Sequence, residues 1–294
     1  MRFMVLVKSS PESEAGVLPD EKMLSEMGAY NDELLKAGVM LAGEGLHASA
    51  KGARVSYAKG KLTVVDGPFA EAKELVAGFW LIQAKSKDEA VAWLKKAPFR
   101  EGEVEIRPLF ELEDFPVDPS EQPGGWRDME TEFKKTAPLQ TTRGNKKMRF
   151  LGFVLADKDT EAGIMPEEKD LAAMGAFIEE ATKAGVFLGG EGLKPTSEGV
   201  RVVYEGSKRT VVDGPFTETK EVIAGYSILA VDSKEEAIEW TKRFAQVDAS
   251  VRPRGEARCE IRQIAELEDF PVSPDEKPGG WRDQERKYRE ELSR

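Results

Sequence analysis

The stretch Thr63-Val64-Val65-Asp66-Gly67-Pro68-Phe69 returns without a change as Thr210-Val211-Val212-Asp213-Gly214-Pro215-Phe216. Outward from it, residues 1–93 align without a gap on residues 148–240 at an offset of 147, and roughly half of the positions are identical. A period of this length is far longer than that of a solenoid repeat. Each copy is therefore predicted to be a domain rather than one unit of a stack.

The ends of the two copies also match, but at a different offset. Leu112-Glu113-Asp114-Phe115-Pro116 corresponds to Leu267-Glu268-Asp269-Phe270-Pro271 at an offset of 155. The second copy therefore carries about eight extra residues between Trp240 and Cys259. The polar and charged sequence between the copies is typical of a linker. We expect a first domain at 1–126, a linker at 127–147, a second domain at 148–282 and a polar C-terminal tail at 283–294.

Within one copy, strand and helix patterns alternate. The helix that begins at Pro19 and Asp20 has apolar residues at spacings of three and four and ends at Gly38. A capping box at Ser86 and Glu89 begins the next helix. Strands are predicted at 3–7, 39–48, 54–57, 62–65, 79–84 and 104–110. The order β-α-β-β-(β)-α-β predicts an α+β fold, in which an antiparallel sheet carries two helices on one face.

The other face of such a sheet needs a cover if it is apolar. A second copy in the same chain supplies one at high effective concentration. We therefore predict two tandem ferredoxin-like domains that pack sheet against sheet, as a pseudo-dimer within one chain. Further oligomerisation stays open.

Composition excludes several classes of protein. The 294 residues include 54 acidic and 43 basic side chains, with no basic stripe that could neutralise nucleic-acid phosphates. Cys259 is the single cysteine, so no internal disulfide can form, and no Cys/His set for zinc exists. The N-terminal apolar run Phe3 to Val7 is too short for a signal peptide, and no run is long enough to span a membrane. We expect a cytoplasmic protein that binds neither nucleic acid nor membrane.

The segment from Val65 to Glu74, with its Asp-Gly-Pro-Phe-x-Glu-x-Lys-Glu pattern, and its repeat at 213–221 resemble the YCII-related family, specifically its DGPF branch. The Gly-Glu-Gly-Leu segments within 42–46 and 189–193 fit the same family. The resemblance implies a ferredoxin-like dimeric α+β barrel. It implies no assigned reaction, because the branch is largely of unassigned function. Some members are associated with alternative sigma factors, and in the wider family a His and an Asp in a cleft have been proposed as an acid-base pair.

Asp66 and Asp213 are candidate general bases. Each ends a predicted strand, and the strand's alternation places the carboxylate at the margin of the cleft between the sheets. Partial desolvation there would raise its pKa toward the range of a general base. The alternative is turn chemistry, in which the Asp side chain accepts from backbone amides and the proline fixes φ.

Glu44 and Glu191 lie between glycines, where a carboxylate can face a cavity that larger side chains would fill. They are candidate ligand-binding residues. The alternative is an ordinary ion pair with Arg54 or Arg201 on the neighbouring strand, and these arginines are candidate ligand-binding residues as well.

His47 is the one side chain whose unperturbed pKa lies near neutrality, which makes it a candidate catalytic acid or base. The second copy has Lys194 at this position, so a catalytic His47 would give one site instead of two. The alternative is a solvent-facing histidine at a strand end.

Lys73 and Lys220 follow the Asp-Gly-Pro-Phe turns, where either could neutralise an anionic ligand; the alternative is a solvated charged face. Cys259 aligns with Val104 and is predicted to be a small buried residue. Trp80 aligns with Ser227. If that position faces inward, the large-to-small difference leaves one half of the cleft roomier than the other.

Three classes of function remain open from the sequence. One is an enzyme with acid-base chemistry of the lyase or isomerase kind, and another is a non-catalytic module that binds a small molecule, including an anion. The last is an interaction or regulatory protein, linked to a sigma factor through the resemblance. No cofactor or metal is expected, because no Gly-rich phosphate loop and no metal-ligand spacing occur.

Overall fold

The computed structural model describes residues 1–70, 74–115, 131, 147–216, 221–270 and 280–292. The first copy contains β1 (Arg2–Lys8), α1 (Pro11–Glu14), α2 (Glu21–Lys36), β2 (Met40–Gly45), β3 (Ala53–Ala58), β4 (Lys61–Asp66), β5 (Val76–Gln83), α3 (Lys87–Leu94) and β6 (Glu101–Pro108). The second copy contains β7 (Met148–Leu155), α5 (Lys158–Glu161), α6 (Glu168–Lys183), β8 (Phe187–Gly192), β9 (Val200–Glu205), β10 (Lys208–Asp213), β11 (Ile223–Val231), α7 (Lys234–Val251) and β12 (Ala257–Gln263). Helix α8 (Trp281–Leu292) follows it.

Local sequence explains where the helices begin and end. The Asp20 carboxylate accepts from the Met23 amide at 2.7 Å at the start of α2, and Gly38 follows the helix with φ of 67°. Ser86 caps α3 by accepting from the Glu89 amide at 3.2 Å. The Glu89 side chain bonds the amide of Lys85 instead of the Ser86 amide, so only half of the expected capping box forms.

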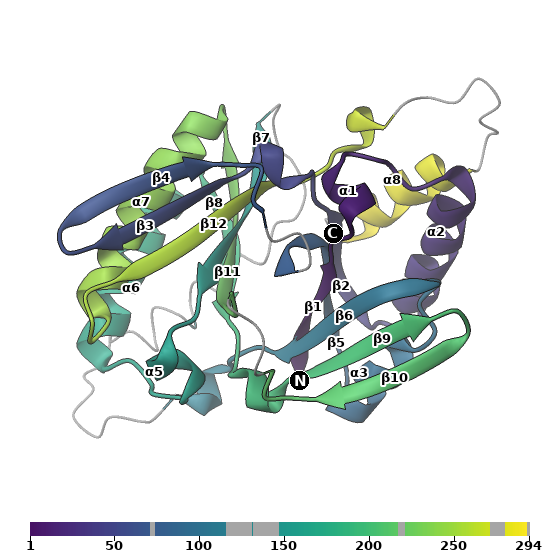
Figure 1. Ribbon diagram of the computed structural model, residues 1–294, viewed down its shortest axis with the longest axis horizontal. Helices are drawn as coiled ribbons and strands as arrows, with labels where there is room; N and C mark the ends of the chain where they lie inside the picture. The colour runs from purple at the N-terminus through teal and green to yellow at the C-terminus, as the bar shows by residue number, and fades with distance from the viewer. Residues whose placement is uncertain (71–73, 116–130, 132–146, 217–220, 271–279, 293–294) are drawn as a thin grey trace.

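Each sheet combines four strands of one copy with a hairpin of the other. The strand orders are β10-β9-β6-β1-β5-β2 and β4-β3-β12-β7-β11-β8, and all pairs are antiparallel. In Figure 1 the β3–β4 hairpin lies beside β12 at the left, and the β9–β10 hairpin lies beside β6 at the right. The two copies have therefore exchanged their hairpins.

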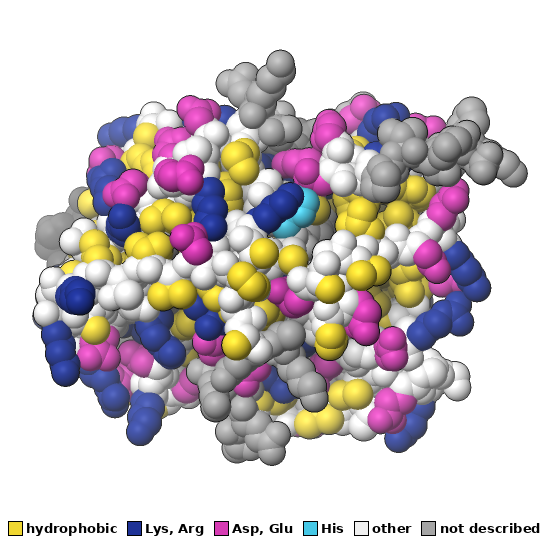
Figure 2. Space-filling model, turned by 45° about the horizontal axis from the view of Figure 1, so that its top comes forward, with side chains coloured by type: hydrophobic (Ala, Val, Ile, Leu, Met, Phe, Trp, Pro, Cys, Tyr) yellow, Lys and Arg dark blue, Asp and Glu magenta, His cyan; other side chains and the backbone are white. Residues whose placement is uncertain are grey.

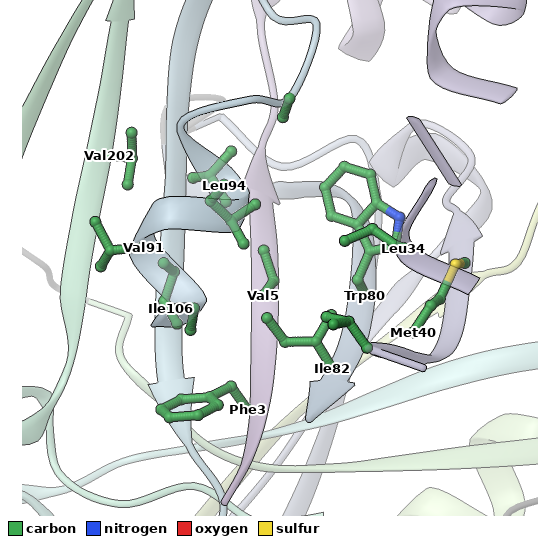
Figure 3. Close-up of a cluster of buried hydrophobic side chains, with 14 of the residues drawn as sticks. Phe3, Val5, Leu34, Met40, Trp80, Ile82, Val91, Leu94, Ile106 and Val202 are labelled. Atoms are coloured by element: carbon green, nitrogen blue, oxygen red, sulfur yellow. The ribbon is translucent and has the colours of Figure 1, made fainter. Parts of the chain in front are cut away.

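The exchanged strands complete the core of the copy that receives them. Val202 of β9 is buried opposite Val104 of β6, and Figure 3 shows it beside Val91 and Ile106. The Tyr204 hydroxyl donates to the carbonyl oxygen of Leu94 at 2.6 Å. Because this hairpin buries its side chains in the other copy's core, neither half closes its own core without the other.

The inner faces of the two sheets pack against each other, which confirms the predicted α+β fold. The cluster between the sheets combines side chains of both: Met4, Leu6, Phe79 and Leu81 with Leu151, Phe153, Tyr226 and Ile228. Helices α2, α3 and α8 cover the outer face of the first sheet, and α6 and α7 cover that of the second (Figure 1). Each copy thus has an inner core shared with its neighbour and an outer core under its helices.

The outer layers of the two copies differ in two ways. Helix α7 has 18 residues where α3 has 8, so the inserted residues lengthen this helix. The stretch 283–294, which the sequence presents as a polar tail, includes most of α8, which packs on α2. The buried Tyr288 of α8 donates to the Gly43 carbonyl oxygen at 2.6 Å.

Candidate functional site

A cavity of about 280 Å³ lies between the second sheet and helices α6 and α7. Its volume is close to the lower end of the range of ~300–1,000 Å³ that is typical of small-molecule sites. Strands β7, β8, β11 and β12 form one wall, and the two helices form the wall opposite. The residues that line the cavity therefore all belong to the second copy.

The two walls have different chemistry. Side chains alternate along β7, so Leu151 and Phe153 lie between the sheets while Gly152 faces the helices. The sheet wall consists largely of small residues: Gly152, Gly190, Gly192, Gly225 and Ser227. The helix wall is apolar and rich in aromatic rings: Met174, Phe177, Ile178, Trp240 and Phe244. A wall made largely of small residues opposite an aromatic wall suits a planar apolar group.

The equivalent space in the first copy is filled by the protein's own side chains. The Trp80 side chain is 6% exposed, and its indole N–H donates to Asn31 Oδ1 at 3.0 Å. The Tyr30 ring meets it edge-on with centroids 6.0 Å apart, and Figure 3 shows Trp80 between its strand and Leu34. At three aligned positions around this space the second copy has smaller residues: Ser227 for Trp80, Gly152 for Val5 and Ala181 for Leu34.

Sequence comparison of Trp80 with Ser227 predicted that one half has more room, and the cavity lies in that half. Its place differs from the expectation, because the hollow lies on the helix side of the second sheet. The cleft between the sheets is instead packed with apolar side chains. The difference in side-chain size between Trp80 and Ser227 predicts a hollow. The side of the sheet on which the hollow lies depends on the direction in which that side chain points.

One end of the cavity is polar and is formed by the lengthened α7. Asp248 and Arg252 line it, with Arg252 Nε 2.8 Å from Asp248 Oδ2. Arg252 also lies 3.2 Å from a carboxylate oxygen of Asp157. Burial raises the pKa of Asp248, against the attraction of Arg252, and the neighbouring Asp157 adds to the rise. Burial also raises the pKa of the Cys259 thiol, which lines the cavity and stays protonated at neutral pH.

Glu44 and Glu191 occupy equivalent places, and each pairs with an arginine of the other copy. Arg149 lies 2.6 Å and Arg289 2.8 Å from the Glu44 carboxylate. Burial raises the pKa of Glu44 to about 7, although both arginines oppose the rise. Arg2 lies 2.5 Å from the carboxylate of Glu191, which also lines the cavity. Of the predicted site residues, Glu191 is one that the structure places at this cavity.

The alternative interpretation, an ion pair of these glutamates with Arg54 or Arg201, names other arginines than those the structure places beside them. Arg54 bonds Glu260 at 2.8 Å, and Arg201 bonds Glu105 at 3.0 Å. Both arginines come from the exchanged hairpins and bond carboxylates of the sheet that receives them. Each guanidinium also stacks on the phenylalanine of an Asp-Gly-Pro-Phe turn. The distance from Cζ to the ring centroid is 4.2 Å for Arg54 on Phe69 and 4.0 Å for Arg201 on Phe216.

Asp66 and Asp213 lie at the exposed ends of β4 and β10, away from the cavity. Their side chains are 69% and 77% exposed and lie 2.7 Å from Lys234 and 3.7 Å from Lys87. The glycine that follows is required by close packing, because a Cβ at Gly67 would lie 1.9 Å from the Ser49 carbonyl oxygen. Both carboxylates are therefore exposed and paired with lysines, and neither lines the cavity.

His47 forms a contact between the copies. Its Nε2 lies 2.9 Å from a carboxylate oxygen of Asp269, and its counterpart Lys194 lies 2.5 Å from Asp114. The side chain is mostly buried, and Figure 2 shows the cyan imidazole at the molecular surface, beside a basic side chain. His47 does not line the cavity. Lys73 and Lys220 lie outside the described residues.

Sequence reasoning missed the residues that shape the cavity most. Gly152 stands where the first copy has Val5, and Asp248 and Arg252 belong to the insertion. Both signals were present in the alignment of the copies, as a missing side chain in a strand and as extra residues before Cys259. Among the described residues, no group of three His, Cys, Asp or Glu side chains is placed to hold a metal ion.

A buried cluster of charged side chains around Glu105 makes the stability of the protein depend on pH. Burial by itself would raise the pKa of Glu105, but Lys8, Arg107 and Arg201, within 3.0 to 3.1 Å, lower it to about 2. A lowered carboxyl pKa contributes stability above the unfolded value near 4.5, and this contribution disappears as the pH falls toward 2. The shift corresponds to about 3 kcal/mol.

We expect Glu105→Gln to lose this contribution, so that its free energy of unfolding falls less steeply than the wild type's between pH 5 and pH 2.5. Urea unfolding at a series of pH values measures both slopes. Glu103→Gln is the control, because Glu103 also contacts Arg201, at 3.2 Å, but is partly exposed. Equal slopes for the wild type and Glu105→Gln would contradict the assignment.

Comparisons with known proteins agree with the duplicated architecture. The family model of the YCII-related domain matches residues 1–113 and again residues 148–256. An uncharacterized protein of Rhizobium meliloti (strain 1021) is 34% identical over 93 residues, which are 31% of this chain and 75% of that protein. In the described part of the chain, no helix is both long and apolar enough to cross a membrane.

Proposed function

Because the chain belongs to the YCII-related family, whose domain it carries twice, we propose that its second domain binds a small, planar, mainly apolar molecule in the cavity under α6 and α7. In this proposal the first domain is the structural partner. It supplies the opposing sheet and the β3–β4 hairpin that completes the second sheet. The repeated Asp-Gly-Pro-Phe motif supports membership of the DGPF branch, which is part of the proposal.

The observation that carries the proposal is the contrast between the two copies. Duplicated domains begin with the same packing, and an apolar hollow loses stability unless something fills it. The first copy fills this position with the Trp80 indole, whereas the second has Ser227 and a cavity. A bound molecule of similar shape would restore the missing contacts.

The proposal assigns binding and no reaction. The candidate acid-base residues Asp66, Asp213 and His47 are absent from the described residues that line the cavity. The side chains that do line it are mostly apolar, with a few polar groups at one end, as is common in sites that hold a ligand by shape.

Replacement of Ser227 by tryptophan tests the proposal. We expect Ser227→Trp to place an indole in the cavity, as Trp80 does in the first copy, and to weaken binding of free indole at least tenfold. Calorimetric titration of the full chain with indole, and with naphthalene as an entirely apolar probe, measures the affinity. Ser227→Ala is the matched control, because it leaves the space open and should change the affinity less than threefold.

Two results would count against the proposal. One is a wild-type protein that binds neither indole at millimolar concentration nor naphthalene at its limit of solubility. The other is a Ser227→Trp variant, folded by circular dichroism, that binds indole as tightly as the wild type does.

A further inference from the structure

We infer that the molecule bound in the cavity is an aromatic amine, with its ring between the glycine wall and the aromatic wall and its ammonium group at Asp248. This inference rests on the proposed function and goes beyond it by naming the chemical class of the ligand. It depends on three features of the cavity: the shape of the ring slot, which is the space between the glycine wall and the aromatic wall, the hydrogen bonding of the Asp248 carboxylate, and the contacts that Arg252 already makes.

The ring slot favours an aromatic group over an aliphatic chain. The Phe177 ring lies edge-on to Trp240 and Phe244, with centroid distances of 6.0 Å and 5.8 Å, so the helix wall is a preassembled aromatic cluster. Opposite it, Gly152 and Gly225 present backbone without a side chain. A flat ring can contact both walls at once and gains the edge and face contacts that aromatic pairs prefer.

The Asp248 carboxylate can accept a further hydrogen bond from a molecule in the cavity. Its side chain is only 10% exposed and lines the cavity. Arg252 Nε lies 2.8 Å from Oδ2 and pairs with it, but its N–H is poorly aligned with that oxygen. A carboxylate can accept several hydrogen bonds, and an ammonium group in the cavity would supply a better aligned donor than Arg252 does.

Arg252 is poorly placed to attract an anion. Its guanidinium is shared between Asp248 and Asp157, and Nη1 also lies 3.4 Å from the Leu155 carbonyl oxygen. An anionic ligand would approach the carboxylate of Asp248 together with that of Glu191, which lines the same cavity, whereas Arg2, the partner of Glu191, does not line it. Like charges at close range oppose binding. The cavity therefore favours a cation, and not the anion considered from the sequence.

The first copy offers an internal precedent for the donor. There, the Trp80 ring nitrogen donates to an oxygen on α2, that of Asn31. The second copy has Ile178 at the position of Asn31, so α6 offers no oxygen at this place. The polar group that a ligand can reach is instead on α7, where the insertion has added Asp248.

Three probes with one ring system test the inference: indole, tryptamine and indole-3-acetate, each titrated into the full chain at pH 7. They are neutral, cationic and anionic at this pH. We expect tryptamine to bind at least tenfold more tightly than indole-3-acetate. In Asp248→Asn, tryptamine should lose most of this advantage while indole binds within about threefold of wild type. Asp88→Asn, the same change at an exposed site of α3, is the control and should alter none of the three affinities.

The outcomes separate this inference from the proposed function. If indole binds and Ser227→Trp abolishes its binding, but indole-3-acetate binds as tightly as tryptamine, the amine assignment is overturned and the proposed function stands. An amine preference that survives intact in a folded Asp248→Asn also overturns the assignment. If none of the three probes binds the wild type, both proposals fail.

Discussion

Arg149→Ala is expected to lower the free energy of unfolding by about 3–5 kcal/mol, the cost of removing one partner from a buried ion pair. The Arg149 side chain is 1% exposed and bonds Glu44 at 2.6 Å and both carboxylate oxygens of Glu266 at 2.8 Å and 2.9 Å. Its loss leaves the carboxylates of Glu44 and Glu266 with Arg289 as the cation that contacts both of them. Burial that already holds the pKa of Glu44 near 7 makes a further unpaired charge costly.

Arg2→Ala is the matched control, because Arg2 occupies the same position in the first copy. Its side chain is 30% exposed, and its pairs with Glu111 and Glu191 are correspondingly closer to water. We expect it to cost about 1 kcal/mol, near the upper end of the range for exposed pairs. Urea unfolding at pH 7 measures both variants, and equal losses would contradict the unequal burial of the two clusters. The Arg149→Ala defect should also shrink at pH 5, where protonation of Glu44 is favoured.

Trp80→Ala is expected to lower the free energy of unfolding by about 3–5 kcal/mol, in the range for truncating a buried large aromatic side chain. The indole is packed against Tyr30 and Phe99, with centroids 6.0 Å away in both cases. Its removal opens in the first copy a hollow like the one in the second. It also leaves the buried Asn31 amide oxygen without its donor, which adds to the cost.

Trp93→Ala is the control for this variant, because it removes the same side chain from a half-buried position in α3. We expect a loss of about 1–2 kcal/mol there, in proportion to the smaller apolar area removed from water. Added indole should raise the melting temperature of Trp80→Ala more than that of Trp93→Ala, since only the former gains a hollow of the right shape. A thermal denaturation series with and without indole decides this, and an identical shift in the two variants would contradict the packing described for Trp80.

The elements were predictable because their signals are local. Asp20 and Gly38 bound α2 through hydrogen bonds and a positive φ within a few residues of the helix ends. The patterns at 54–57 and 62–65 predicted strands β3 and β4, which pair with each other, in the same way. The pairing of that hairpin with β12 was not predictable from the sequence. The apolar side chain of Val55 could be buried in the sheet of either copy, and only the packing of both copies decides which strand lies beside β3.

The candidate site was predictable only in part. The alignment of Trp80 with Ser227 indicated a difference in volume, and the extra residues before Cys259 indicated a longer connection. Neither feature could show that the hollow faces α6 and α7, or that Asp248 lies at its end. Glu44 and Glu191 were recognised as unusual, yet their arginine partners come from the first strand of the opposite copy, more than a hundred residues away in sequence.

Duplication, the α+β class and the order of the strands and helices follow from the amino-acid sequence, because repeats, periodicity and capping residues act along the chain. The hairpin exchange, the partners of the buried charges and the position of the cavity depend on contacts between distant residues. Those contacts are selected by which apolar surfaces and charges can be buried together. Trp80 and Ser227 show the difference: the sequence contains the substitution, and the packing around each position makes one a core residue and the other the wall of a cavity.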